Sequence, residues 1–565
     1  MDRLSHAWLW CLIAMLIGAG CTSAREPGTA SQSPTAQAAI PKRLVAAIKG
    51  NPGFISYSLN SGGGGRIDGA TELSGLTSSG LSVLGPTGAA MPVLSEQLPT
   101  VENGLWVLLP DGRMETTWRI RDGARWHDGT AFTADDVVFT SQLARDPEMP
   151  WIVDRIYPFI EKVEAPDPRT LRVTWKEPYI RADQVPFDPP YPRHLLERPY
   201  QQQKDSIAGL SYWNSDFVGT GPFKVREFVR DSHVMLAAFD DYVFGRPKVD
   251  EIQVKFIPDE NALAANLLAA SVDFTLGPGL TVEEAIQVRD RWADGKMRTG
   301  PSGWININPQ FLNPDPPILA NLSFRRALYM AIDRPRLVDA LTLGLSEVAH
   351  SSINPAEPEY RSIESSIVRW EYEPRRSAQM IEELGYQKGS DGMFMDSAGK
   401  ALSVQIMATQ DDANAKPQFA VLDMWKTIGI TPDVEVVTTQ RQRDLSYRAT
   451  FRNFSLQAGF GYGPDGMNSL LTREARIPER NYIGNNYTRY MNPEIDGLVD
   501  RYFTTIPFGE RMQVLARLVR HTTDNVIWMP LYWRVLPTLT NDRVVGVQPL
   551  GEGNQWADAY QWDLK

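Results

Sequence analysis

The spacing of hydrophobic and polar positions divides the chain into two regions. Within residues 1–40, one apolar run from Ala7 to Ile17 is followed by a stretch of small and polar residues at 22–40. From residue 41 onward, segments with helical spacing of apolar residues alternate with strand-like segments, which predicts a mixed α/β fold. No second long apolar run and no internal repeat follow residue 41, which argues against several membrane spans.

The apolar run near the N-terminus has the form of a secretory signal. Its eleven residues are too few for a membrane-spanning helix, because a span needs about 20 apolar residues. Small residues at 18–20 follow the run, as they do at signal cleavage sites. We therefore predict a signal peptide at residues 1–20.

Cys21 follows the small residues directly, so the junction resembles the lipobox of bacterial lipoproteins. In that motif the cysteine is lipidated and becomes the first mature residue. Gly18 stands where the motif usually has leucine, and Asp2 balances Arg3 ahead of the apolar run, so a plain cleaved signal is the alternative. We predict that Cys21 carries a lipid and that residues 21–40, rich in Ser, Thr, Ala, Pro and Gly, form a flexible tether.

Residues 114–143 predict a hairpin that leads into a capped helix. Met114 to Ile120 is expected to be a strand and Ala124 to His127 its returning partner. Thr133 is expected to cap the following helix, with Asp136 three residues later in the position of a capping box.

Composition narrows the class of function. The chain of 565 residues has 57 Lys and Arg against 68 Asp and Glu, a net charge of −11, which argues against a general nucleic-acid binder. The six histidines show no HExxH spacing, and no Gly-x-Ser-x-Gly motif is present, so a secreted hydrolase has little support. No Cys or His cluster has the spacing of a metal site. We therefore expect no catalytic residues, no metal ligands and no cofactor.

The run WRIRDGARWHDGTAFTADDVVFT, residues 118–140, resembles the signature of the family 5 extracellular solute-binding proteins, the oligopeptide- and dipeptide-binding proteins of ABC importers. Four later segments resemble the family in the same order: GTGPF at 219–223, LLAASVDF at 267–274, FRRALYMAIDRPRLV at 324–338 and EYEPRRSAQMIEELGY at 371–386. The resemblance covers roughly residues 43–560.

The resemblance implies a fold similar to type II periplasmic binding proteins, with two lobes joined by two crossing strands and an extra domain inserted in lobe one. The predicted boundaries are residues 41–302 for lobe one, with the inserted domain at about 57–200, residues 303–526 for lobe two, and residues 527–565 for the return to lobe one.

In the resembling proteins a peptide binds between the lobes as an added strand. The stretches expected to cross between the lobes, 302–308 and 526–534, are apolar and aromatic. The residues expected to line the cleft are Trp304, Asn306, Trp528, Tyr532 and Trp533. Core packing is the alternative role for each of the aromatic residues.

A departure from the family concerns the acid that meets a peptide's ammonium group. Peptide-binding members resemble one another in a run reading aromatic-x-Ala-Asp-Tyr, and here Tyr462 matches while Gly461 stands in place of the Asp. Asp465 is the nearest acid, and a loop shift would let it substitute. Tyr462 and Asp465 are therefore further candidate ligand-binding residues.

We thus expect a lipid-anchored, extracytoplasmic binding protein, at the cell membrane or in the periplasm, that acts as a monomer and delivers a peptide or similar solute to an ABC permease. The family also includes binders of nickel chelates, oligosaccharides, opines and heme, and the sequence does not choose among them. A secreted hydrolase and a chaperone-like or sensory receptor on the same fold are the alternatives.

Overall fold

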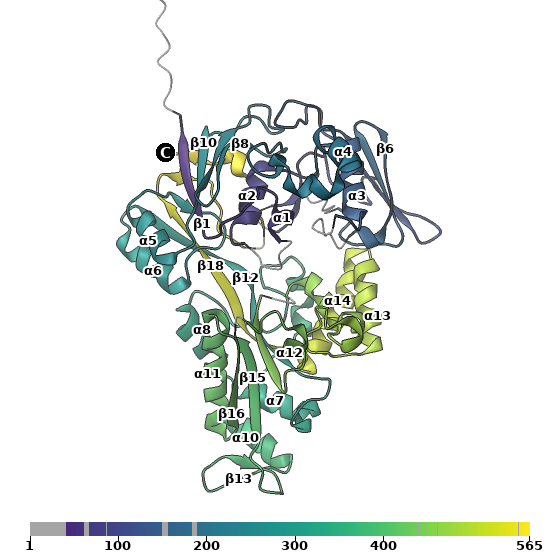
Figure 1. Cartoon of the computed structure of the whole chain (residues 1–565). Coiled ribbons are helices and arrows are strands. Elements are labelled where there is room, and N and C mark those ends of the chain that lie inside the picture. Colours follow the sequence, from purple (N-terminus) through teal and green to yellow (C-terminus); the bar gives the residue numbers. More distant parts are fainter. Residues whose placement is uncertain are drawn as a thin grey trace, which may run out of the picture. The chain divides into compact units, whose positions relative to one another are not determined.

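A ten-stranded mixed sheet is the main framework of the protein (Figure 1). The computed structural model describes residues 41–61, 67–85, 88–149, 156–183, 189–438, 440–459, 462–551 and 553–565. The predicted signal peptide, the tether, the lipidation site Cys21 and the departure at Gly461 lie outside these described residues. Residues 41–565 form a single compact unit.

The strands of the large sheet come from distant parts of the chain. In spatial order they are β16 (Thr431–Val437), β15 (Ser403–Thr409), β17 (Phe454–Ala458), β12 (Gly295–Pro309), β18 (Met529–Asn541), β11 (Phe274–Thr275), β1 (Arg43–Ile48), β10 (Glu251–Phe256), β9 (His233–Ala238) and β8 (Phe223–Val229). β1 pairs in parallel with β10 and β11, and β15 in parallel with β16 and β17, whereas β12 and β18 are antiparallel. The sheet is thus mixed, as predicted for an α/β fold.

The long strands β12 and β18 join the two halves of this sheet. Residues 295–301 of β12 pair with residues 535–541 of β18, and then residues 304–307 pair with residues 529–533. The register shifts between these two stretches, at Gly303, whose φ is +85°. This positive φ favours glycine, and a Cβ would also lie only 3.0 Å from Gly459 Cα. The paired strands therefore form a two-stranded connection between lobes, and the domain boundaries at 302 and 526 stay predictions.

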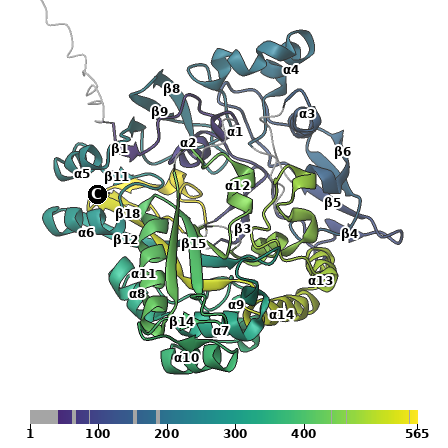
Figure 2. The same cartoon turned by 60° about the horizontal axis from the view of Figure 1, so that its bottom comes forward.

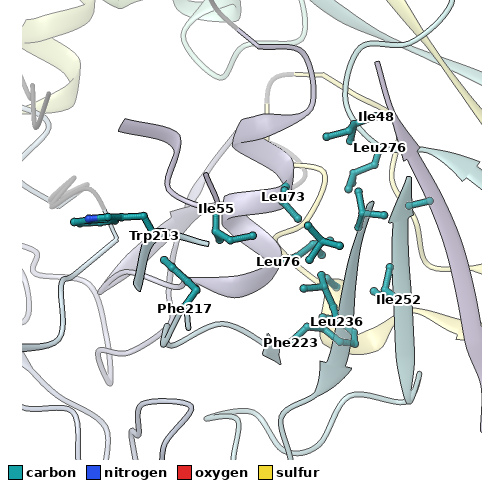
Figure 3. Close-up of a cluster of buried hydrophobic side chains, with 14 of the residues drawn as sticks. Ile48, Ile55, Leu73, Leu76, Trp213, Phe217, Phe223, Leu236, Ile252 and Leu276 are labelled. Carbon is teal, nitrogen blue, oxygen red and sulfur yellow. The ribbon is translucent and has the colours of Figure 1, made fainter. Parts of the chain in front are cut away.

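Lobe one buries its core between the sheet and helix α2 (Ala70–Thr77). Figure 3 shows Leu73 and Leu76 of this helix facing Phe223, Leu236 and Ile252, which come from β8, β9 and β10. All five side chains are buried. Burial of each contributes about 1.5–3 kcal/mol, so α2 is held firmly on the sheet, and this matters because α2 forms part of the site described below.

Lobe two has two hydrophobic cores, one on each face of β12. Ile305 and Ile307 pack with α7 (Leu322–Met330), α8 (Arg334–Thr342), α10 (Pro374–Glu383) and α11 (Asp412–Ile428). Trp304 faces the other way, toward α13 (Pro493–Thr504) and α14 (Phe508–Asp524). Side chains alternate between the faces of a strand, so a single strand serves both cores. Figures 1 and 2 both show α11 beside β15 and α13 beside α14.

A separate four-stranded antiparallel sheet lies within the range predicted for the inserted domain. Its strands in order are β4 (Trp106–Leu108), β5 (Met114–Arg119), β7 (Thr170–Trp175) and β6 (Ile160–Asp167). The predicted strand at Met114 is confirmed. The predicted partner strand at Ala124 to His127 is wrong, because β4 and β7 already pair with β5 on both sides. Residues 124–132 instead close a tight loop, in which Trp126 N donates to Thr130 O over 2.8 Å.

The predicted helix cap is confirmed. Helix α3 (Ala134–Arg145) begins after Thr133, whose backbone N–H donates to Asp136 Oδ2 at 2.9 Å.

Within the described residues, no helix has both the length and the apolar character that a bilayer span requires.

Candidate functional site

A cavity with a volume of about 400 Å³ opens beside α2, where lobe one faces lobe two. This volume is in the range of small-molecule sites, about 300–1,000 Å³. Its walls also include Tyr57 of α1 (Tyr57–Ser61), the hairpin of β2 (Ser82–Leu84) and β3 (Ala90–Pro92), and Trp556 near the C-terminus. Asp465, at the start of the 3₁₀ helix η6 (Pro464–Leu470), is the described lobe-two residue on the wall.

The lobe-one wall combines hydroxyl groups with aromatic rings. The hydroxyl-bearing serines are Ser74, Ser78, Ser79 and Ser82, and the aromatic residues are Tyr57, Tyr179, Tyr242 and Trp556. Tyr242 OH lies 3.5 Å from Ser79 Oγ, and burial raises the pKa of Tyr242 to about 12, so its hydroxyl stays neutral. Such a wall offers hydrogen bonds and apolar contact without charge.

Gly75 sets the position of the Trp556 ring against the cavity. Both residues line the wall, and a Cβ on Gly75 would lie 2.0 Å from Trp556 Nε1. The helix α2 therefore tolerates a glycine in its interior, despite its cost to helix stability, because the indole ring occupies the space of the missing side chain.

The GTGPF segment forms the floor behind α2. A Cβ on Gly219 would lie 2.1 Å from Thr77 O, and one on Gly221 would lie 2.4 Å from Ser78 N. Only glycine allows the two backbones to approach this closely. Pro222, the next residue, lines the cavity, so this motif positions the wall without contributing a functional side chain.

His127 of the signature fastens that floor to the inserted domain. Its Nδ1 accepts a hydrogen bond from Gly219 N at 3.1 Å, and its Nε2 lies 3.0 Å from Gly221 O, so Nε2 carries the proton. Burial lowers the pKa of His127 to about 4. The neutral ring thus links two of the five sequence motifs, in a structural role.

An ion pair joins the two lobes at the cavity wall. Arg181 Nε and Nη2 each lie 2.9 Å from Asp465 Oδ1. Burial alone would lower the pKa of the Arg181 guanidinium, but Asp465, Tyr502 and Glu359 together outweigh burial and raise it. One residue earlier, Ile180 N donates to Phe503 O of α13 at 3.1 Å. Residues 179–183, here termed the arm, belong to lobe one but contact lobe two, and they place the positive charge of Arg181 beside Asp465.

A second cavity, of about 210 Å³, lies on another side of the crossing strands. Lys416 of α11 and Glu283 of α6 (Val282–Arg291) both line it, and Lys416 Nζ lies 3.3 Å from Glu283 Oε2. Tyr532 and Ile305 form part of its wall. This cavity has charged groups of both signs and lies between lobe two and the α6 side of lobe one.

The three tryptophans predicted for the cleft lie together in a lobe-two core. The rings of Trp304 and Trp528 meet edge to face at 5.6 Å, and those of Trp304 and Trp533 stack at 6.3 Å. Trp304 has no exposed surface. In this structure none of the three borders the 400 Å³ cavity, so their predicted contact with ligand stays a prediction.

The other predicted residues have different surroundings. Asn306 is buried, and its Oδ1 has no hydrogen-bond partner within the described residues. Tyr532 lines the second cavity rather than the first. Tyr462 is exposed and its ring approaches Gly303 of the crossing strand. Asp465 alone of the predicted set borders the larger cavity.

Sequence reasoning missed most of the lobe-one wall. The run TSSGLS at 77–82 supplies several of its hydroxyl groups, and its composition was a usable signal. Arg181 gave no signal, because its pairing with a residue 284 positions later depends on the fold. Within the described part of the chain, no group of three or more His, Cys, Asp or Glu side chains is placed to hold a metal ion.

Two lobes joined by a pair of antiparallel strands, with a solute-sized cavity walled by both, define a bilobal binding protein with a type II periplasmic-binding-protein-like fold. The chain belongs to the bacterial extracellular solute-binding proteins of family 5, whose middle-region model matches residues 106–474. It is thus a solute-binding protein of extracytoplasmic location, in a family of binding proteins rather than enzymes.

Relatives and solved structures agree with this assignment. A putative ABC transporter peptide-binding protein of Brucella ovis is 26% identical over 413 residues, 72% of this chain and 73% of that protein. Heme-binding protein A of Haemophilus influenzae is 24% identical over 447 residues, 75% and 77% of the two chains. The oligopeptide-binding protein of an oligopeptide ABC transporter of Thermotoga maritima has the same fold, with a TM-score of 0.75 at 18% identity, over 93% of this chain and 99% of that one.

Proposed function

We propose that this protein captures a peptide or similar small solute in the 400 Å³ cavity and delivers it to the permease of an ABC importer. The observation that carries the proposal is the cavity itself, which is walled by lobe one and reached by Asp465 of lobe two. The Brucella ovis relative, a putative ABC transporter peptide-binding protein, supports the choice of partner and solute.

Apart from Arg181, the lobe-one wall carries no charged side chain among the described residues, which suits the main chain of a short peptide. Serine hydroxyls both donate and accept hydrogen bonds, which matches the alternating N–H and C=O groups of a peptide. Trp556 and the tyrosines supply apolar contact for side chains without selecting one of them. Asp465 accepts the ligand's ammonium group in a charge-assisted bond, in place of the acid missing at residue 461.

Capture involves hinge motion about the crossing strands. Glycine 303 and the register shift beside it give β12 a point at which the lobes can rotate. Closure holds Asp465 and the arm, which border the cavity in this structure, around the solute and excludes water from it. Trp304 on β12, Trp533 on β18 and Trp528, the residue before β18, lie close to this hinge point. We therefore retain them, with Asn306 and Tyr532, as candidates for contact in the liganded state.

Lipid attachment at Cys21 would keep this body at the membrane, where the permease lies. Replacement of Cys21 by Ser is expected to move the protein from the membrane fraction to the soluble fraction and to remove the lipid mass from its N-terminal peptide. Wild-type protein found in the soluble fraction, with no lipid mass on its N-terminal peptide, would show that the signal is a plain cleaved one.

Binding and closure can be measured on the mature protein with a pool of tri- to pentapeptides. We expect saturable binding by calorimetry, a smaller radius of gyration in small-angle scattering, and no cleavage of the recovered peptides. The Trp556→Ala variant should lose at least tenfold in affinity. The matched control Trp370→Ala removes an indole that donates to Thr523 O in lobe two, away from the cavity, and should bind normally. Absence of both binding and compaction would refute the proposal.

A further inference from the structure

The inserted domain reaches lobe two through the arm, residues 179–183. Tyr179 fixes the base of the arm, because its ring stacks on Phe159 at 4.8 Å and on Trp175 at 5.6 Å. Both partners belong to the small sheet of the inserted domain, since Trp175 ends β7 and Phe159 directly precedes β6. The arm therefore moves together with the inserted domain.

The inserted domain is in turn fastened to the rest of lobe one. His127 bonds it to the backbone of Gly219 and Gly221. At the end of the arm, Ser82 Oγ of β2 donates to Asp183 O over 3.4 Å. A rotation of lobe one about the crossing strands must therefore carry the arm toward lobe two or away from it.

The tip of the arm enters the core of lobe two. Ile180 is 8% exposed and belongs to the hydrophobic core around Trp304, whose other described members all lie within residues 304–533. The backbone N–H of Ile180 donates to Phe503 O, near the end of α13, at 3.1 Å. Lobe two thus buries an apolar side chain of lobe one and also accepts its main-chain hydrogen bond.

Lobe two contributes an isoleucine to the same junction. Ile506, in the loop between α13 and α14, packs against the core of the inserted domain as well as against its own core. Arg511 holds this loop in place, because its Nη1 donates to Thr505 O at 3.3 Å and to Ile506 O at 2.8 Å. Ile180 and Ile506 therefore form a reciprocal contact, in which each packs on the core of the opposite lobe.

Apolar burial is the main force that holds this junction. The ion pair of Arg181 with Asp465 lies next to Ile180, but the Asp465 side chain is 59% exposed, and exposed ion pairs contribute little. Separation of the lobes would instead bring Ile180 into water. Burial of one isoleucine side chain favours a contact by about 10- to 150-fold in its equilibrium constant.

We propose that the arm is a clasp that holds the two lobes closed and must undock before a solute can enter or leave. The inserted domain thereby sets the rate of solute release, although neither Ile180 nor Ile506 is among the described residues that border the 400 Å³ cavity. Loss of the clasp raises the open population and speeds release without removal of a contact to the solute. This inference rests on the proposed function and gives the inserted domain a role in it.

Hydrogen exchange followed by mass spectrometry tests undocking on the solute-free protein, because the Ile180 amide bonds across the lobes. Ile506→Ala leaves the sequence of the arm intact and should speed exchange of that amide about fivefold or more. Small-angle scattering should give a larger radius of gyration for Ile506→Ala and for Ile180→Ala than for the wild-type protein.

Release of trialanine, followed by stopped-flow tryptophan fluorescence, tests the consequence for the solute. Ile180→Ala should release it about tenfold faster or more. If this variant fails to fold, the release rate of Ile506→Ala takes its place. The matched control is Ile367→Ala, because Ile367 is 9% exposed in the same core but lies within lobe two. The control should lower the denaturant midpoint and keep wild-type arm exchange, radius of gyration and release rate.

The outcomes separate the clasp from peptide capture. An unprotected Ile180 amide in the wild-type protein, or exchange that Ile506→Ala leaves unchanged, overturns the clasp and leaves peptide capture standing. Faster exchange with an unchanged radius of gyration and release rate also overturns it, because the arm is then only static packing. Failure of trialanine to bind the wild-type protein counts against the proposed peptide function, and exchange and scattering then decide the clasp alone.

Discussion

His127 is buried as a neutral imidazole, and its protonation is expected to weaken the joint between the inserted domain and lobe one. Nδ1 of the ring accepts a hydrogen bond from Gly219 N–H, and Nε2–H donates one to Gly221 O. A second proton on Nδ1 would face the donor Gly219 N–H at 3.1 Å. Protonation in acid therefore replaces a hydrogen bond with a repulsive contact at a buried ring.

The size of the expected loss of folding stability follows from the pKa of His127. Burial is the main cause that lowers the pKa of His127, from 6.5 to about 4. Each unit corresponds to about 1.36 kcal/mol, so the full difference is about 3 kcal/mol. The unfolded chain binds this proton more readily than the folded chain, so the stabilisation is present above pH 6.5 and is lost progressively as the pH falls toward 4. At pH 5 about 2 kcal/mol of it should be gone.

NMR on protein labelled with ¹³C at histidine Cε1 measures this pKa directly. The signal that disappears in His127→Gln belongs to His127, and it should not shift between pH 8 and pH 5. Urea unfolding at pH 7.5 and pH 5 should show the wild-type protein losing about 2 kcal/mol more than the variant. A His127 signal that titrates near pH 6.5, or equal losses in the two proteins, would refute the reasoning.

Three further predictions follow from the packing. Trp304→Ala should cost about 3–5 kcal/mol of stability if the ring serves the core of lobe two; a loss of ligand affinity with unchanged denaturant midpoint would show a ligand contact instead. Gly221→Ala should abolish or strongly weaken folding, because the new Cβ would lie 2.4 Å from Ser78 N; soluble expression with wild-type melting temperature would contradict this. Gly75→Ala should push the Trp556 ring from its place and lower solute affinity severalfold by calorimetry, with little change in circular dichroism; unchanged affinity would show that the ring does not hold the solute.

Most of the fold could be predicted from sequence because it depends on local patterns. The strand at Met114 and the cap at Thr133 follow from residue type and spacing, and both are confirmed. The return strand at 124–127 was predicted wrongly, because pairing of β5 depends on β4 and β7, which a local turn signal cannot reveal. Local residue types and spacing determine where helices and strands form. Which strands pair depends on contacts between distant parts of the chain, as the pairing of β5 with β4 and β7 shows.

The candidate site was harder to predict, because its wall gathers residues from five separate parts of the chain. An aromatic strand has the same sequence whether its rings face a ligand or a core, and Trp304 lies in a core here. Asp465 was found because a family motif pointed to its neighbourhood. Arg181 and Trp556 lie in no motif, and only the fold brings them beside Asp465 and Gly75.

In the proposed function, the cavity between the lobes holds a small solute without transforming it. Native mass spectrometry of the protein purified from its own host tests this most directly, with Val83→Trp, which fills the cavity wall on β2, as the comparison. We expect a non-covalent 1:1 adduct of solute mass on the wild-type protein, released intact on unfolding, and no adduct on the variant. An adduct that persists on Val83→Trp, or a wild-type protein that neither carries nor takes up any solute from a cell extract, would contradict it.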